Sequence, residues 1–395
     1  MTVRDDDVIT GQCPACHSVV PVAGFCGECG ARVGAPVTRL STLLRPSVFA
    51  TAHRETLWLP RVSSTLFPRF PGRQRRPFRI GLIVVLIALI VCSLARFTGP
   101  AGVFTTIGWP LLFLIYVWES DAFGDIPARI MVAATVIGIA TGAGWWLAAG
   151  TVLAGNYGVS TASSLALTKV IDTGFLITLG GTALMLVPAV VGRLFPMTVR
   201  ESLDGFVVGA FGALWYQTAA TTTTLAPQFA EGLMREKSSM RILADSLTYG
   251  VATPLATTAA GGLVGLSLWF RPDRRERRDP RRARTALTVF TVVAVAIYVG
   301  VWAVDAQGYP RVVDVSLKLG LALLALLTTR GAVQIALLHE APDPWTGEPL
   351  LCVHCERVVP DLPFCSACGV AARASSRTSR RLRHEKPPVR DMVSG

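Results

Sequence analysis

Eight of the nine cysteines in this 395-residue chain form two units with one spacing, Cys-x2-Cys-x9-Cys-x2-Cys. A Cys-x-x-Cys pair delivers two thiolates from one tight turn, so two pairs can close tetrahedrally around a single Zn²⁺ ion. Such a quartet leaves no open coordination position, and we therefore predict two structural zinc ions rather than a catalytic one. The predicted ligands are Cys13, Cys16, Cys26 and Cys29 in the first unit, and Cys352, Cys355, Cys365 and Cys368 in the second.

Other uses of cysteine compete with zinc. Disulfides are disfavoured because the topology predicted below places both units in a reducing compartment. A dithiol catalyst needs one reactive pair at a helix start, whereas two pairs recur here as a quartet. Iron bound by four thiolates stays open as an alternative. The neighbouring His17 and His354 are interpreted as surface residues, and Cys92 as a small packing residue.

The two units also share a Val-Val-Pro triplet, a Phe and a closing Gly. Over Cys13–Gly30 and Cys352–Gly369 they resemble the short zinc ribbons found at the termini of bacterial proteins. A segment this short has almost no core, so metal binding, worth roughly 10–16 kcal/mol in such peptides, must fold it. We expect the two ribbons to pack as a pair through the shared Val-Val-Pro and Phe positions.

The region between the ribbons is strongly apolar. Mean hydropathy is +0.48 and only 16% of residues are charged, against about a quarter in soluble domains. A membrane-spanning helix needs about 20 apolar residues, and stretches such as TVIGIATGAGWW carry the small residues that let helices pack closely. We predict an all-α polytopic membrane protein with about eight spans, at 80–97, 101–118, 130–154, 173–194, 205–226, 247–270, 285–304 and 314–338.

Arginine placement predicts the orientation of these spans. Arginines concentrate in residues 1–79, in the loop RPDRRERRDPRRAR and after residue 338. Eight spans put all three segments on one side, which the positive-inside rule assigns to the cytoplasm. We therefore expect a plasma-membrane protein with cytoplasmic termini. The basic loop serves as a topology anchor or binds anionic lipid headgroups, whereas nucleic acid ranks well behind because no aromatic residues interleave with the arginines.

These features divide the chain into five parts. Residues 1–35 and 339–372 are the zinc ribbons, and 80–338 form the helical bundle. Residues 36–79 mix Leu, Phe and Trp with Arg, which suits either a segment lying in the headgroup region or a linker packed on a ribbon. Residues 373–395 have the composition of a disordered basic tail.

Few residues in the predicted spans could do acid–base chemistry. No histidine lies in a span, and the acidic residues fall at span edges. Lys318 and Arg330 flank the centre of the last span, where their long stems can reach the two interfaces or, as the sharper alternative, form a charged transport site. We expect no catalytic residues and no bound organic cofactor.

One stretch suggests a family. Residues 200–221 resemble the PrsW-type intramembrane proteases, whose Asp-Gly-x-x-x-Gly run and aromatic residue match Asp204, Gly205, Gly209 and Tyr216. The resemblance implies a protease scaffold without its active-site groups, since several family residues are replaced. The catalytic Glu-Asn pair and the His fall on Ala220, Thr221 and Thr253, and the Glu-Glu-x-x-Lys element keeps Lys169 but has Leu165 and Ala166.

The whole chain also resembles zinc-ribbon multipass proteins of high-GC bacteria, a likeness that supplies no role. We expect a non-enzymatic scaffold or regulator whose ribbons recruit a cytoplasmic protein partner. The first alternative is a transporter or channel that uses Thr221–Thr224 as a polar lining. The second alternative is an intramembrane protease with an unusual site.

Overall fold

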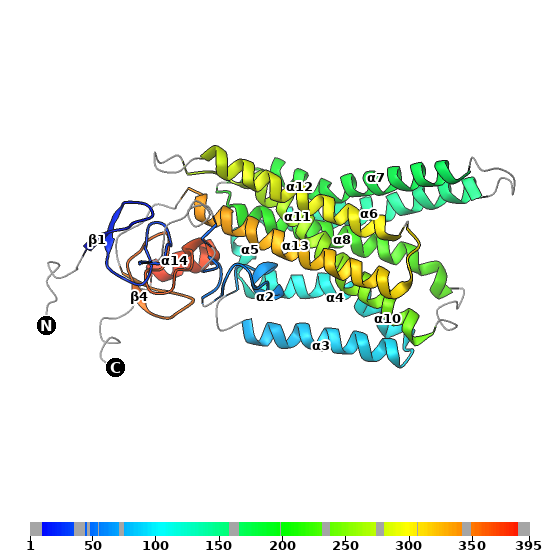
Figure 1. The fold of residues 1–395 in the computed structure, drawn as a ribbon, viewed down its shortest axis with the longest axis horizontal. Helices are drawn as coiled ribbons and strands as arrows, with labels where there is room; N and C mark the ends of the chain where they lie inside the picture. Colours follow the sequence, from blue (N-terminus) through cyan, green and yellow to red (C-terminus); the bar gives the residue numbers. More distant parts are fainter. Residues whose placement is uncertain are drawn as a thin grey trace.

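The chain forms an elongated helical bundle, with both cysteine units at one end of it (Figure 1). We call this end the ribbon end. The computed structural model describes residues 10–34, 44–45, 48–53, 55–70, 75–157, 166–197, 199–230, 238–273, 280–305, 307–341 and 349–385.

The long helices run along the bundle one after another. They are α3 (Arg75–Leu94), α4 (Thr98–Glu119), α6 (Ala128–Tyr157), α7 (Ala166–Leu194), α8 (Ser202–Ala230), α10 (Ser239–Leu247), which continues through the π-helical turn η2 (Thr248–Ala252) into α11 (Thr253–Trp269), then α12 (Pro280–Asp305) and α13 (Arg311–His339). Short elements gather at the ribbon end: β1 (Thr10–Gln12), β2 (Val19–Pro21), α2 (Val62–Thr65), α5 (Ala122–Asp125), β3 (Leu350–Leu351), β4 (Val358–Val359), η3 (Ala372–Ala374) and α14 (Arg377–Glu385).

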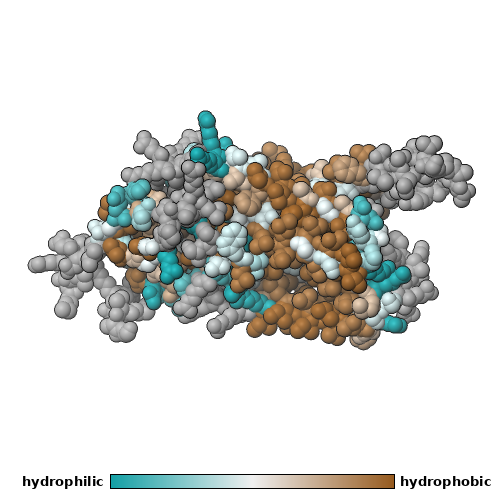
Figure 2. Space-filling view, in the orientation of Figure 1, coloured by the Kyte–Doolittle hydropathy of each residue, from teal (hydrophilic) through white to brown (hydrophobic). Residues whose placement is uncertain are grey.

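Six helices in the described part of the chain are long and apolar enough to cross a membrane. This supports a multi-pass membrane protein, and Figure 2 shows the apolar surface gathered over the bundle, with hydrophilic residues toward its ends. The predicted count of eight is not confirmed, because α3 and α8 do not qualify. The six are Thr98–Glu119, Ala128–Thr151, Phe175–Leu194, Ser239–Trp269, Pro280–Asp305 and Arg311–His339.

Each of the two remaining helices has a physical reason for falling short. The described apolar part of α3, Phe78–Leu94, is a shorter helix, about 25 Å long against a hydrocarbon core of about 30 Å. Helix α8 is long enough, but it carries Gln217 and four consecutive threonines. Its first half is almost wholly buried by its neighbours, and a helix shielded from lipid in this way needs less apolar surface.

Small residues bring the central helices into close contact, as predicted. A Cβ atom on Gly205 or Gly209 of α8 would lie 2.2 Å from the carbonyl oxygens of Gly265 and Gly261 of α11. The two helices therefore run antiparallel with their backbones touching. Helix α6 packs on the other side of α8 in the same manner, through Gly138.

The linker between the first ribbon and α3 packs on the bundle. The Phe67 and Phe70 rings pack against Phe78 and Tyr116, with ring centroids 4.6–5.1 Å apart. Both linker rings are buried. Of the two alternatives for residues 36–79, packing is what the described part shows, although the main contact is with the bundle rather than a ribbon.

The C-terminal segment also differs from its composition-based prediction. Residues 377–385 form α14 and lie against the bundle and the second ribbon, where a disordered tail was expected. The stabilising contacts are ion pairs, described below. The rest of the predicted tail, 386–395, lies outside the described residues.

Candidate metal centres and the ion network that holds them

Each cysteine quartet comes together as a compact group of sulfur atoms. All four Sγ atoms of a unit lie within 4.8 Å of one another. The contacting Sγ pairs are 3.7–3.8 Å apart: Cys13–Cys29, Cys16–Cys26, Cys352–Cys368 and Cys355–Cys365. A tetrahedral ion with metal–sulfur bonds of about 2.3 Å has sulfur–sulfur edges of about 3.8 Å. All eight predicted ligands are therefore placed as a metal requires, although iron fits the same geometry as zinc.

Each ribbon consists of a short hairpin and two tight turns that present the cysteines. A short antiparallel hairpin, β1–β2 or β3–β4, carries the first cysteine pair of each unit. The residue after each pair has positive φ, a conformation that brings two sulfurs to one side of a tight turn. Gly30 and Gly369 follow the second pair, as expected for this conformation, whereas His17 and Glu356 adopt it after the first pair.

The two ribbons pack against each other through reciprocal aromatic contacts. The Phe25 ring covers Gly369, where an added Cβ would lie 2.8 Å from the ring. The equivalent Phe364 ring covers Gly30, where the same distance is 2.6 Å. Each glycine therefore provides room for the aromatic ring of the other ribbon, and a side chain there would separate the pair.

Backbone hydrogen bonds repeat the same symmetry. The Phe25 N–H donates to the Ser366 carbonyl at 3.0 Å, and the Phe364 N–H donates to the Gly27 carbonyl at 2.8 Å. Ser366 and Gly27 occupy equivalent positions in the two units. The ribbons thus meet through one surface used twice, as in an isologous dimer, but within a single chain.

The shared valines are placed differently from the prediction. Val20 and Val359 are buried in the small core of their own ribbon, beside the cysteines. Val19 and Val358 are exposed. The Phe positions therefore contribute to the ribbon–ribbon contact as predicted, whereas the buried valines pack inside their own ribbons.

The linker connects the second ribbon to α13. The Gln334 side chain accepts from the Ala50 N–H at 2.7 Å and donates to the carbonyls of Leu44 and Val48, both at 3.0 Å. The Ala50 carbonyl accepts from the Ala371 N–H at 2.8 Å. One buried glutamine of α13 thus fixes the loop on which the second ribbon rests.

Arg330, one helical turn before Gln334, binds the same linker. Its guanidinium donates to the Glu55 carboxylate at 3.1 Å, to the Thr56 carbonyl at 2.8 Å and to the Ser64 hydroxyl at 3.0 Å. The Phe49 ring lies 3.7 Å from the guanidinium carbon. The side chain is fully buried, so its position in the last span marks a structural attachment.

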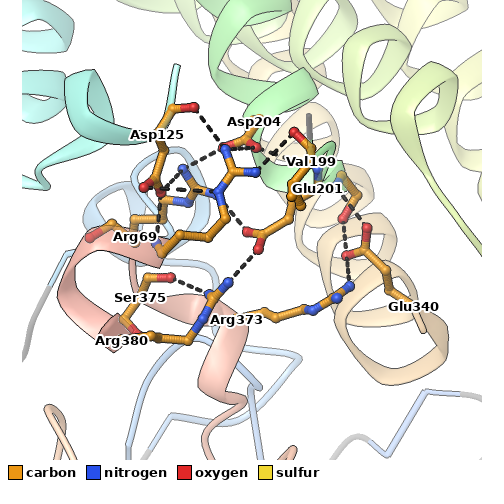
Figure 3. A network of polar contacts seen from close by, with 12 residues as sticks. Arg69, Asp125, Val199, Glu201, Asp204, Glu340, Arg373, Ser375 and Arg380 are labelled. Atoms are coloured by element: carbon orange, nitrogen blue, oxygen red, sulfur yellow. Dashed lines mark hydrogen bonds and ion pairs between the residues drawn. The ribbon is translucent and has the colours of Figure 1, made fainter. Parts of the chain in front are cut away.

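A larger network of charges joins the second ribbon to the ribbon end of the bundle (Figure 3). It contains four arginines and four carboxylates, and each carboxylate side chain is at most 1% exposed. Equal numbers of opposite charges satisfy one another where water is excluded. The members are Arg69, Arg373, Arg377 and Arg380 with Asp125, Glu201, Asp204 and Glu340.

Arg69 lies at the centre of this network. Its guanidinium reaches Asp204 at 2.7 Å, Glu201 at 3.0 Å and Asp125 at 3.4 Å. Its own side chain has no exposed surface, and its backbone N–H donates to the Tyr116 hydroxyl at 3.3 Å. The linker, α5 and the start of α8 therefore converge on a single cation.

Two of the carboxylates also cap the N-termini of helices other than their own. Asp125 accepts from the backbone N–H groups of Arg377 and Thr378 at 2.7 and 3.0 Å, so it neutralises the N-terminus of α14. Glu340 accepts from the Ser202 N–H at 2.8 Å and from its hydroxyl at 2.7 Å, at the start of α8. Helix α14 therefore depends on a residue from α5 for its first turn.

Burial raises the pKa of Glu340 to about 7, although Arg373, 3.3 Å away, and the Ser202 donors act in the opposite direction. The carboxyl is fully enclosed at the end of α13. Its protonation state therefore changes near neutral pH, within a network that is otherwise balanced in charge.

Sequence reasoning missed this network. Asp125 stood out only as part of an acidic loop, Asp204 as part of the PrsW-like run, and Arg377 as part of a basic tail. The sequence did contain one indication of the network, which is charge complementarity. Acidic residues at the ends of predicted spans lie on the same predicted side of the membrane as the arginine-rich tail. Which acid meets which arginine depends on the tertiary fold.

The residues suggested for transport have other contacts. Lys318 pairs with Asp305 and with Asp314, the latter at 2.9 Å, near the turn between α12 and α13. The hydroxyls of Thr223 and Thr224 donate to carbonyls one turn earlier in α8. These interactions stabilise helices and their connection, and they provide no specific support for a transport path.

The PrsW-like positions lie along the seam between α8 and α11. The antiparallel glycine contacts bring Thr253 to about the level of Gln217, whose amide donates to the Thr221 hydroxyl at 2.8 Å. Asp204 lies instead at the ribbon end, paired with Arg69 and Arg377. Asp204 holds the C-terminal segment in place at the start of α8, several turns away from Gln217 and Thr221.

Fold and site together define a multi-helix membrane protein carrying two four-cysteine centres. Comparison with protein-family models, with curated proteins and with solved structures gave no match for the chain. The resemblance to PrsW-type proteases thus gains no support, and the function must be argued from the site itself.

Proposed function

We propose that this protein is a membrane-anchored adaptor whose paired zinc ribbons recruit a cytoplasmic protein partner to the bilayer. The ribbon end faces the cytoplasm in this proposal, because the arginine-rich segments predict that orientation. Zinc is the metal because closed four-cysteine centres of this spacing are characteristic of structural zinc. The sites stabilise the platform and take no part in a reaction.

One observation supports recruitment above the alternatives. A surface that is covered by the linker in the second ribbon is exposed at the equivalent position of the first ribbon. Ala371 of the second ribbon is buried and hydrogen-bonded to the linker. The equivalent residue of the first ribbon, Arg32, is exposed, and Val33 beside it is 40% exposed. One ribbon therefore docks through this surface, while its mate presents the same surface to solvent.

The first ribbon carries further exposed apolar side chains. Val19 and Val22 of the first ribbon are 72% and 60% exposed. On a unit this small, several exposed valines beside an arginine favour a protein contact over simple solvation. The ion network fixes the platform relative to the bundle, so a partner bound there would be held at a set distance from the membrane.

The test is proximity labelling in intact cells with a labelling enzyme fused to the chain, followed by binding of the purified candidate. The wild type is compared with Val19→Ser/Val33→Ser. The matched control is Val358→Ser, the equivalent of Val19 in the docked ribbon. We expect a partner that binds the wild type and the control but binds the double variant at least tenfold more weakly.

A second comparison tests whether binding also requires the metal-stabilised fold of the ribbons. Cys13→Ser/Cys352→Ser removes a ligand from each centre and should lose the same partner together with the metal. If the labelled set is identical for the wild type, the valine variant and the cysteine variant, recruitment by the ribbons is excluded.

A further inference from the structure

A groove runs along α3 at the ribbon end of the bundle, with a volume of about 400 Å³. Its walls come from α3, α4 and the η2–α11 turn, and they are apolar along their length, through residues such as Leu86, Leu89 and Trp109. The Trp109 indole N–H already donates to the Gly250 carbonyl at 2.7 Å. The wall therefore presents a hydrocarbon surface with its polar atom satisfied.

Polar and aromatic contacts attach α3 to the bundle near both of its ends. Near its start, Phe78 packs on the linker aromatics and Arg79 donates to Ser63 at 3.0 Å. Near its end, the Ser93 hydroxyl donates to Ser246 at 2.9 Å. Between these points the groove follows the helix from Arg79 to Leu89, about 15 Å at 1.5 Å per residue. This is half of a hydrocarbon core of about 30 Å, which is the depth of one leaflet.

The end of the groove nearest the ribbons is polar and carries excess positive charge. Arg61, Ser63 and Arg79 line it. Glu55 pairs with Arg61 at 3.3 Å, with Arg79 at 3.2 Å and with Arg330 at 3.1 Å. Among the described side chains joined by these pairs, three cations share one carboxylate, a net charge of about +2. Arg61 and Arg79 are also partly exposed, with side chains 45% and 38% accessible.

From this arrangement we infer that the groove is a binding site for an anionic phospholipid of the leaflet on the ribbon side. One acyl chain lies along α3 against Ile83 and Leu86, which are 55% and 40% exposed, and the phosphate accepts hydrogen bonds from Arg61, Arg79 and Ser63. Charge complementarity selects an anionic headgroup, and the one-leaflet depth selects a lipid over a soluble phosphate compound. The site is separate from the free ribbon surface of the proposed function.

The test uses the full chain purified in a neutral detergent, with native mass spectrometry to count bound lipid. Phosphatidylglycerol is titrated against phosphatidylcholine of the same chain length, and glycerol 3-phosphate serves as the headgroup without chains. We expect one phosphatidylglycerol to bind at least tenfold more tightly than phosphatidylcholine, and no binding of glycerol phosphate at the same concentrations.

Two variants with different mechanisms locate the site. Arg61→Gln/Arg79→Gln removes both exposed cations and should weaken phosphatidylglycerol binding roughly 30-fold while leaving phosphatidylcholine unchanged. Leu86→Trp fills the groove without altering charge and should abolish the single tight site. The matched control, Arg281→Gln/Arg284→Gln, removes two arginines from the exposed start of α12 at the same end and should bind as the wild type does.

Several outcomes would overturn the inference. Equal affinity for the two lipids excludes headgroup selection, and binding of glycerol phosphate shows a soluble anion site instead. An equal loss in the α12 control shows diffuse attraction to basic surface. Tight binding that survives Leu86→Trp places the lipid elsewhere, even if the arginine variant fails to fold.

Discussion

The two ribbons share one sequence pattern and one metal geometry, yet their surroundings separate them. The second ribbon is held between the linker, α13 and α14, with Ala371 and Phe364 buried in the main core. The first ribbon packs on its mate, and its Arg32 and Val33 stay exposed. The repeated motif therefore determines the fold of each ribbon. The residues packed around a ribbon determine whether its surface is buried against the bundle or exposed to solvent.

The largest effect should come from removing a metal ligand in one ribbon at a time. Cys26→Ser and Cys365→Ser are equivalent positions, and each should lower bound metal from two ions to one. Loss of about 10–16 kcal/mol of metal binding unfolds the affected ribbon. Only Cys365→Ser should also release α14, because that helix follows the second ribbon.

Metal analysis by mass spectrometry and limited trypsin digestion of the arginine-rich α14 check this pair. Rapid cleavage of α14 in Cys365→Ser but not in Cys26→Ser is expected. If α14 were cut equally fast in both variants, the two ribbons would be equally important for the C-terminal segment, contrary to the structure.

Next in size is the attachment of the second ribbon to the bundle. Asp125→Asn keeps the shape of the side chain but removes its charge from the pairs with Arg69 and Arg377. Breaking a buried ion pair typically costs 3–5 kcal/mol, so the variant should unfold at lower denaturant and expose α14. Asp121→Asn, an exposed neighbour, is the control and should change stability by less than about 0.5 kcal/mol.

The reciprocal aromatic contact should respond unequally to equivalent changes. Phe364→Ala removes a fully buried ring and should cost about 3–5 kcal/mol, the range for buried phenylalanine. Phe25→Ala removes a partly buried ring and should cost about half as much. Denaturant unfolding followed by the release of each metal ion measures both, and equal costs would show that the ribbons are equally embedded.

The last prediction concerns how the stability of the second ribbon's attachment depends on pH. Glu340 has an ordinary pKa of 4.5 and a pKa of about 7 in the folded protein. The folded state therefore holds a proton that the unfolded state releases, and the stability from this group is lost as pH rises through 7. The loss reaches at most about 3 kcal/mol.

Glu340→Gln does not titrate, so its melting temperature relative to the wild type should rise steadily between pH 4.5 and 7.5. Its melting temperature at any single pH also reflects the lost pair with Arg373, and for this reason the slope is the measured quantity. A difference that is flat across this range would place the pKa of Glu340 near its ordinary value.

The sequence was sufficient for the parts that depend on local pattern. The cysteine spacing predicted both quartets, and apolar runs predicted the spans that the structure supports. Glycines such as Gly205 and Gly209 indicated close helix packing. These features depend on residues near one another in the chain or on the solvent that a segment must enter.

The parts that could not be predicted depend on residues far apart in the sequence. Helix α14 has no apolar face, and it forms because Asp125 caps it and arginines on it meet acids from α8. Gln334 lies near the end of a predicted span and no sequence pattern singles it out, yet its side chain holds the linker. Helix α8 was predicted to span the membrane as a mainly apolar run of sufficient length, although its neighbours shield its first half from lipid.

The reciprocal contact between Phe25 and Phe364 also sets an order of assembly. The first ribbon leaves the ribosome some 340 residues before the second is complete, which at about 5–20 residues per second is a delay of roughly 17–68 s. During that time Phe25 has no mate, and the whole bundle is synthesised before one arrives. Closure of the ribbon pair therefore comes after synthesis of the whole bundle, and a chain truncated before Cys352 carries an unmated aromatic surface.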